Sequence, residues 1–157
     1  RSTLFPYTTL FRSTNLNTEK IARALAETLR ADFKKAREVS PEALKNYDLI
    51  GFGSGVYFLK LHQQLFKLAE QIDSLKNKQC FIFSTSGSSF GKFSHRKLRF
   101  ILKQKKAEIL DEFSCKGFDT YGIFGILGGV NKGKPSEKDL EKARNFALEL
   151  RKKKTIR

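Results

Sequence analysis

The chain has 157 residues, of which 39% are hydrophobic and 30% are charged, and fifteen are phenylalanine. This composition suits one domain with a hydrophobic core and argues against general disorder. The apolar runs are much shorter than the ~20 residues of a membrane-spanning helix, and the start lacks the ordered regions of a signal peptide, so we expect a cytoplasmic protein without membrane contact.

The net charge is +15, from 31 lysines and arginines against 16 acidic residues. An acidic protein or a nucleic acid would complement such a charge. The cations are spread over several expected helices, however, and form tight runs at residues 103–106 and 151–154. Since no nucleic-acid-binding motif accompanies them, we interpret the charge as a solvated basic surface and do not expect a nucleic-acid partner.

The N-terminal residues 3–13, TLFPYTTLFRS, resemble the translation of a common sequencing adapter, codon for codon. We therefore predict that residues 1–13 are a non-native segment. Residues 14–152 would then form the domain, and residues 153–157 a basic C-terminal tail. The alternative is a natural, strand-forming start.

The next elements are a helix and a strand. Apolar residues at helical spacing predict a helix from residue 18 to about residue 30, with Thr18 as its capping residue. An extended stretch near residues 31–35 and a brief helix starting at Ser40 and Pro41 follow. Residues 47–53 are largely apolar and end in glycine, which indicates a buried strand.

The rest of the chain continues this alternation. Helices are expected at residues 59–72, 92–105 and 136–151, and strands at 79–83 and 107–114. The pattern predicts an α/β domain, a doubly wound parallel five-stranded sheet covered on both faces. Because a helix comes first, the central first strand is either missing or replaced by residues 1–13.

Three loops at expected strand ends share a small, polar composition without carboxylates. Ligands of doubly wound sheets bind beyond the carboxyl ends of the strands. Hydroxyls and amides at a helix N-terminus can hold a phosphate, and glycine lets a flat ring come close. The candidate binding residues are Thr14, Asn15, Asn17 and Thr18 in the first loop, Ser54, Gly55, Val56 and Tyr57 in the second, and Ser84, Thr85, Ser86 and Gly87 in the third.

Two longer stretches resemble the flavodoxin family: residues 47–57, YDLIGFGSGVY, and residues 112–134, EFSCKGFDTYGIFGILGGVNKGK. The resemblance implies the strand order 2-1-3-4-5, a flavin mononucleotide (FMN) cofactor, and low-potential electron transfer to redox partner proteins. It implies that Asn17 and Thr18 lie near the phosphate, residues 54–57 beside the flavin ring, and residues 84–87 on its other side. We expect an electron carrier rather than an enzyme, and a monomer.

Several other features have alternative interpretations. Residues 128–135, GGVNKGKP, nearly match a phosphate-binding loop, but Pro135 replaces the required hydroxyl. His62 and His95 are interpreted as solvated helix positions, so neither a metal site nor a catalytic residue is expected. Residues 116–134 either cover the flavin edge and meet a partner or form a plain surface loop. The alternative function is a basic interaction domain that binds acidic protein or nucleic acid without flavin.

Overall fold

The computed structural model describes residues 7–12, 16–117, 128, 129 and 131–155. The parallel strands are β1 (Tyr7–Arg12), β2 (Asp32–Lys35), β3 (Leu49–Tyr57), β5 (Gln79–Ser86) and β6 (Glu108–Lys116). Their order across the sheet is β2-β1-β3-β5-β6, and the short β4 (Lys60–Leu61) pairs antiparallel with β3. The doubly wound order expected from the sequence is therefore confirmed once β4 is set aside.

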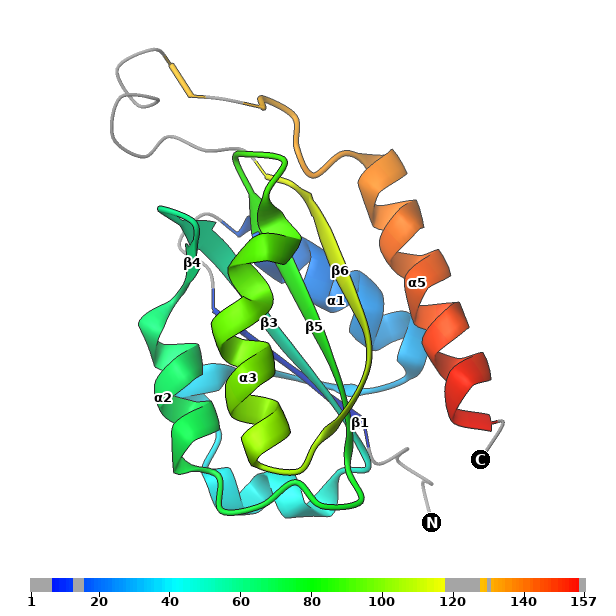
Figure 1. The fold of residues 1–157 in the computed structure, drawn as a ribbon. Coiled ribbons are helices and arrows are strands. Elements are labelled where there is room, and N and C mark those ends of the chain that lie inside the picture. Colours follow the sequence, from blue (N-terminus) through cyan, green and yellow to red (C-terminus); the bar gives the residue numbers. More distant parts are fainter. Residues whose placement is uncertain (1–6, 13–15, 118–127, 130, 156–157) are drawn as a thin grey trace.

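The central strand β1 is formed by residues 7–12, within the segment that resembles an adapter (Figure 1). Thr9 pairs with Phe33 of β2 on one side and with Gly51 of β3 on the other. The central strand is therefore not missing: residues 7–12 occupy its position.

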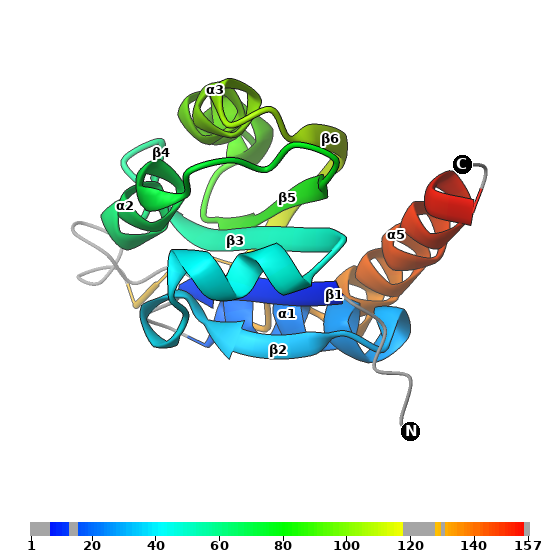
Figure 2. The same cartoon turned by 90° about the horizontal axis from the view of Figure 1, so that it is seen from below.

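Helices cover both faces of the sheet (Figure 2). On one side lie α1 (Asn17–Leu29) and α5 (Glu137–Thr155), and on the other α2 (Gln63–Gln71) and α3 (Arg96–Gln104). The basic tail expected at 153–157 overlaps the last turn of α5. Three 3-10 helices lie at Ala36–Glu38, Pro41–Asn46 and Gly91–His95, and Ser40 caps the second of them through the amide of Ala43.

The core has two layers because side chains alternate along each strand. In β5, Phe81 and Phe83 pack toward α1 and α5, whereas Ile82 packs toward α2 and α3. The Phe83 ring crosses β3 at Gly53, where an added Cβ would lie 1.9 Å from Phe83 Cζ. Glycine in β3 thus allows the close approach of a neighbouring aromatic ring.

Three details of the expected elements are wrong. Thr18 does not cap the first helix, because α1 already begins at Asn17 and Leu16 occupies the capping position. Residues 54–57 are not a free loop but the end of β3, which turns directly into β4. The next helix therefore begins at Gln63 rather than at residue 59.

Candidate functional site

The first candidate loop leads into α1. Thr14 and Asn15 lie outside the described residues, whereas Asn17 and Thr18 are buried in the first turn of the helix. Leu16 has a left-handed backbone, with φ of 57°, and its apolar side chain provides no cap. The amides and the dipole at this helix end therefore favour an anion.

The start of α1 meets the ends of β5 and β6. Thr18 Oγ1 and Thr85 Oγ1 are hydrogen-bonded at 2.8 Å. At Gly117, just after β6, a Cβ would lie 3.1 Å from Asn17 Nδ2 and 3.2 Å from Thr85 Cβ. The first and third candidate loops are thus brought together at one edge of the sheet.

The second candidate segment forms a hairpin instead of an open loop. Its turn residues Phe58 and Leu59 have φ of 47° and 60°, as a tight hairpin turn requires. The Ser54 hydroxyl donates to the Gly55 carbonyl at 2.6 Å and accepts from the His62 amide at 2.8 Å, so it fixes the start of the hairpin.

Tyr57 and Val56 turn in different directions at this hairpin. The Tyr57 ring packs over Gly55, where an added Cβ would lie 2.9 Å from the phenolic oxygen, and it meets the His62 ring edge-on at 6.4 Å. Val56 is buried in the core beneath α2 and α3. Tyr57 and Gly55 therefore present a ring and bare backbone, while Val56 can contact a ligand through its main chain.

The third candidate segment has its hydroxyls in different surroundings. Ser84 is fully buried, Thr85 points to Thr18, and Ser86 lies 3.2 Å from the Ser88 hydroxyl. The half-buried Gly87 follows β5, and its carbonyl accepts a hydrogen bond from Asn131 at 3.0 Å. Asn131 also donates to the Gly117 carbonyl at 3.3 Å. Asn131 thus links the ends of β5 and β6, a role that the sequence reading missed.

A buried polar network lies directly beneath the third segment, and it corrects the interpretation of His95. This residue is not solvated: it has no exposed surface, and its Nε2 lies 2.8 Å from Ser84 Oγ. Its Nδ1 lies 2.9 Å from the Glu112 carboxylate, which also accepts from Arg99 at 2.5 and 2.8 Å. Little in the sequence signals this network, because Glu112 stands beside Asp111 in a strand of mixed polarity.

The surroundings set the charge of these groups. Burial lowers the pKa of His95, against the opposing effect of Glu112. Burial alone would raise the pKa of Glu112, but hydrogen bonds from Arg99 and His95 hold it below its ordinary value. A carboxylate, a histidine and a serine in this order resemble a hydrolytic triad. Ser84, however, has no exposed surface, so it is not available to attack a substrate.

Other chemistry finds little support in the described residues. They contain no group of three or more His, Cys, Asp or Glu side chains that could hold a metal ion. Burial raises the pKa of Cys115 to about 12, which agrees with a structural thiol.

No helix in the described part of the chain is long and apolar enough to cross a bilayer. Most of the segment at residues 116–134 lies outside the described residues.

Comparison with known proteins finds one family and one curated relative that match most of the chain. Residues 9–121 match the model of a flavodoxin domain family. An uncharacterized protein of Methanocaldococcus jannaschii is 53% identical over 135 residues, covering 85% of this chain and 89% of the relative. Both matches extend over most of the fold.

Solved structures share the architecture at low identity. Flavodoxin 2 from Bacillus cereus has a TM-score of 0.73 at 18% identity, covering 94% of this chain and 98% of its own. A flavodoxin from Streptococcus pneumoniae has a TM-score of 0.72 at 19% identity, with the same coverages. A rubredoxin:oxygen oxidoreductase from Desulfovibrio gigas has a TM-score of 0.68 at 18% identity, and the match covers 90% of this chain but 34% of that larger chain.

Proposed function

The chain belongs to the flavodoxin domain family, and from this premise we propose that it binds FMN and carries electrons at low potential between redox partner proteins. The observation that carries the proposal is the convergence of three elements at one sheet edge. The Thr18–Thr85 hydrogen bond joins the start of α1 to the end of β5, and Gly117 leaves the adjoining end of β6 without a side chain.

The residues at this edge suit the parts of the cofactor. The N-terminal turn of α1, with Asn17 and Thr18, would hold the phosphate through backbone amides. Thr14 and Asn15 are proposed for the same loop. Tyr57, packed on Gly55, would lie beside the flavin ring, and Ser86 and Gly87 on its other side. Ser54, Val56, Ser84 and Thr85 complete the proposed set through main-chain contacts or by holding these segments in place.

The chemistry of the proposal is divided between cofactor and protein. FMN, when bound, supplies the reversible uptake and release of electrons. The chain would bind and orient it, keep water from one face of the ring, and provide a surface for the partner. No side chain is proposed as a catalytic group, so the protein would be a carrier rather than an enzyme.

Titration of the flavin-free chain with FMN tests the proposal. We expect 1:1 binding, seen as quenching of FMN fluorescence and a shift of its visible absorbance. Riboflavin, which lacks the phosphate, should bind more weakly because it forgoes the contacts at α1. Thr18→Val and Thr85→Val should both weaken FMN binding, since each removes the hydroxyl pair that joins two loops.

Thr28→Val is the matched control, because Thr28 lies in the last turn of the same helix and bonds to the Ala24 carbonyl, away from the edge. If Thr28→Val weakens FMN binding as much as Thr18→Val, the assignment of the phosphate site is contradicted. The absence of any FMN quenching contradicts the proposed function itself.

The origin of residues 1–13 is a separate proposal that bears on this experiment. The family match begins at residue 9, inside this segment, and β1 is built from it. We propose that the codons come from an adapter joined to a natural reading frame. Sequencing of the source DNA should find different codons upstream of Thr14, and the form carrying them should be titrated beside this one. Recovery of the same codons in genomic DNA contradicts this origin.

A further inference from the structure

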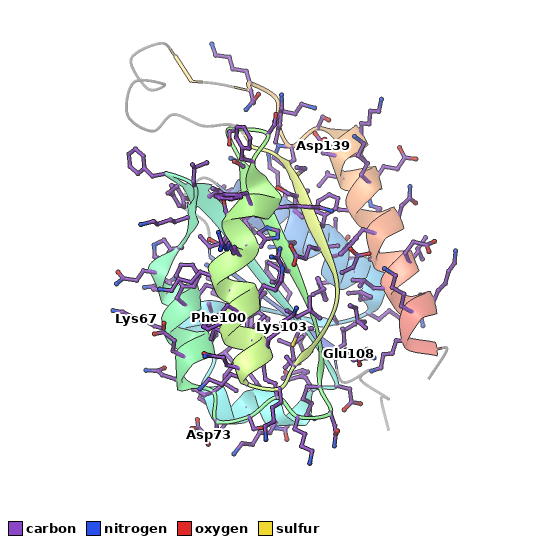
Figure 3. All side chains as sticks on the ribbon, viewed as in Figure 1. Lys67, Asp73, Phe100, Lys103, Glu108 and Asp139 are labelled. Carbon is purple, nitrogen blue, oxygen red and sulfur yellow. The ribbon has the colours of Figure 1, made fainter. Side chains whose placement is uncertain are left out.

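One cavity lies outside the proposed flavin site, between α2 and α3. It is a groove of about 840 Å³, and no carboxylate is among its described lining residues. Apolar and cationic side chains face it together: Phe66, Phe93 and Phe100, with Lys60, Arg96 and Lys97. Figure 3 shows Phe100 on α3 and Lys67 on α2, on the face of the molecule that these helices cover.

The aromatic side chains of this groove are unusually open to solvent. Phe93 and Phe100 are 61% and 62% exposed, while Phe66 forms a buried floor. The Lys97 ammonium lies 4.6 Å from the centre of the Phe66 ring. Its contact with Glu70 is 4.0 Å between two exposed side chains, a weak ion pair that leaves the cation largely uncompensated.

The exposed apolar surface extends from the groove to the proposed flavin site. Phe58 and Leu59 form the turn that follows Tyr57, and Leu59 also lines the groove. Phe90 follows the third candidate segment and is joined to Phe93 through a backbone hydrogen bond. Contiguous exposed apolar side chains with charged neighbours are typical of interaction surfaces.

The charge of the groove selects the kind of occupant. A second copy of a chain with net charge +15 would be repelled, whereas an acidic partner would be attracted and steered. Single-stranded nucleic acid also uses cations and aromatic rings. The continuity with the flavin site favours a protein, because electron transfer requires a partner close to the cofactor.

We propose that the groove between α2 and α3 docks an acidic redox protein at the edge of the flavin site. This inference rests on the proposed function for its redox character. The phenylalanines would form the dry centre of the interface, and Lys60, Arg96 and Lys97 its charged rim.

The test uses the full chain and a fluorescently labelled plant-type [2Fe–2S] ferredoxin as an acidic redox probe. Fluorescence anisotropy gives its Kd with and without FMN, and basic cytochrome c serves as the probe of opposite charge. We expect Arg96→Glu/Lys97→Glu and Phe93→Ala/Phe100→Ala each to weaken ferredoxin binding by about tenfold or more. All four side chains are exposed, so folding should be preserved.

The matched control is Lys138→Glu/Lys142→Glu, which makes the same charge change at exposed positions of α5, across the sheet from α3 (Figure 2). It should change the Kd for ferredoxin by no more than about twofold, which measures the general effect of the lower net charge. Equal losses in the control and groove variants overturn the proposal. So do failure to bind ferredoxin, equal binding of cytochrome c, and displacement of ferredoxin by an oligothymidylate that binds the groove more tightly.

FMN quenching, measured on every variant, separates the two proposals. Groove variants that lose ferredoxin but keep FMN affinity support the docking surface. If the chain never binds FMN but still binds ferredoxin through the groove, the proposed function fails and the acidic docking surface stands.

Discussion

Replacing Glu112 by glutamine tests whether the buried network holds β5, β6 and α3 together. The carboxylate receives hydrogen bonds from Arg99 at 2.5 and 2.8 Å and lies 2.9 Å from His95 Nδ1. Glutamine keeps the shape but removes the charge that compensates Arg99. Removing one partner of a buried ion pair costs on the order of 3–5 kcal/mol. Because the Arg99 side chain is 35% exposed, solvent screens part of this effect. We expect the free energy of unfolding to fall by about 2 kcal/mol.

Urea denaturation at neutral pH measures this loss. The control is Glu70→Gln, since Glu70 is an exposed carboxylate that lies 4.0 Å from Lys97. It should change the free energy of unfolding by less than about 0.5 kcal/mol. If Glu112→Gln destabilises the chain no more than this control, the network does not contribute as argued.

The same network predicts a pH dependence. The pKa of His95 is lowered by burial from 6.5, and that of Glu112 is held below 4.5 by its hydrogen bonds although burial opposes this. Each group takes up its proton at a higher pH in the unfolded chain than in the folded chain. The unfolded chain is therefore favoured as the pH falls, and stability should decrease below about pH 6.5 and again below about pH 4.5. His95→Gln should remove the first decrease. A stability profile that is the same in both proteins between about pH 8 and pH 5 contradicts this assignment.

Three further predictions concern packing, reactivity and capping. Gly53→Ala places Cβ against the Phe83 ring and should lower the free energy of unfolding by about 1–3 kcal/mol. In a double-mutant cycle, Phe83→Leu should restore part of this loss, and strictly additive losses argue against the contact. Cys115, with a pKa raised to about 12 by burial, should resist a thiol reagent at mildly alkaline pH until urea unfolds the chain, so rapid labelling of the folded protein contradicts its burial. Asp139, labelled in Figure 3, accepts from the Ser136 amide and hydroxyl, and Asp139→Ala should cost about 1 kcal/mol at neutral pH. In the wild-type chain the stabilising effect of Asp139 should disappear as the pH falls toward about 2, where its carboxylate is protonated. If Asp139→Ala is still less stable than the wild type at that pH, the capping role is contradicted.

Strands and helices could be predicted because each has a strong local pattern. The buried strand at 79–83 appears in β5, and the capped final helix appears in α5 with the Ser136–Asp139 hydrogen bonds. Family membership could be predicted too, since residues 47–57 and 112–134 resemble the family, and the family match includes all of the first stretch and residues 112–121 of the second. The β3–β4 hairpin was not predicted, because small polar residues are compatible with both the end of a strand and an open loop. The two can be distinguished only from the backbone angles of the turn.

The burial of His95 could not be predicted from its neighbours in the sequence. In the sequence it stands between basic residues of a helix, which indicated a solvated position. Its burial depends on Ser84 and Glu112, which come from two other strands and reach it only when the sheet is assembled.

The sequence by itself determined the alternation of elements, the two-layer core and the composition of the candidate loops, because these follow from periodicity and residue type. The tertiary structure decided which loop atoms meet. Thr18 and Thr85 are 67 positions apart and bond because α1 begins where β5 ends. It also placed exposed phenylalanines beside cationic side chains between α2 and α3. Such contacts depend on the packing of elements that are distant in the chain, which no local pattern encodes.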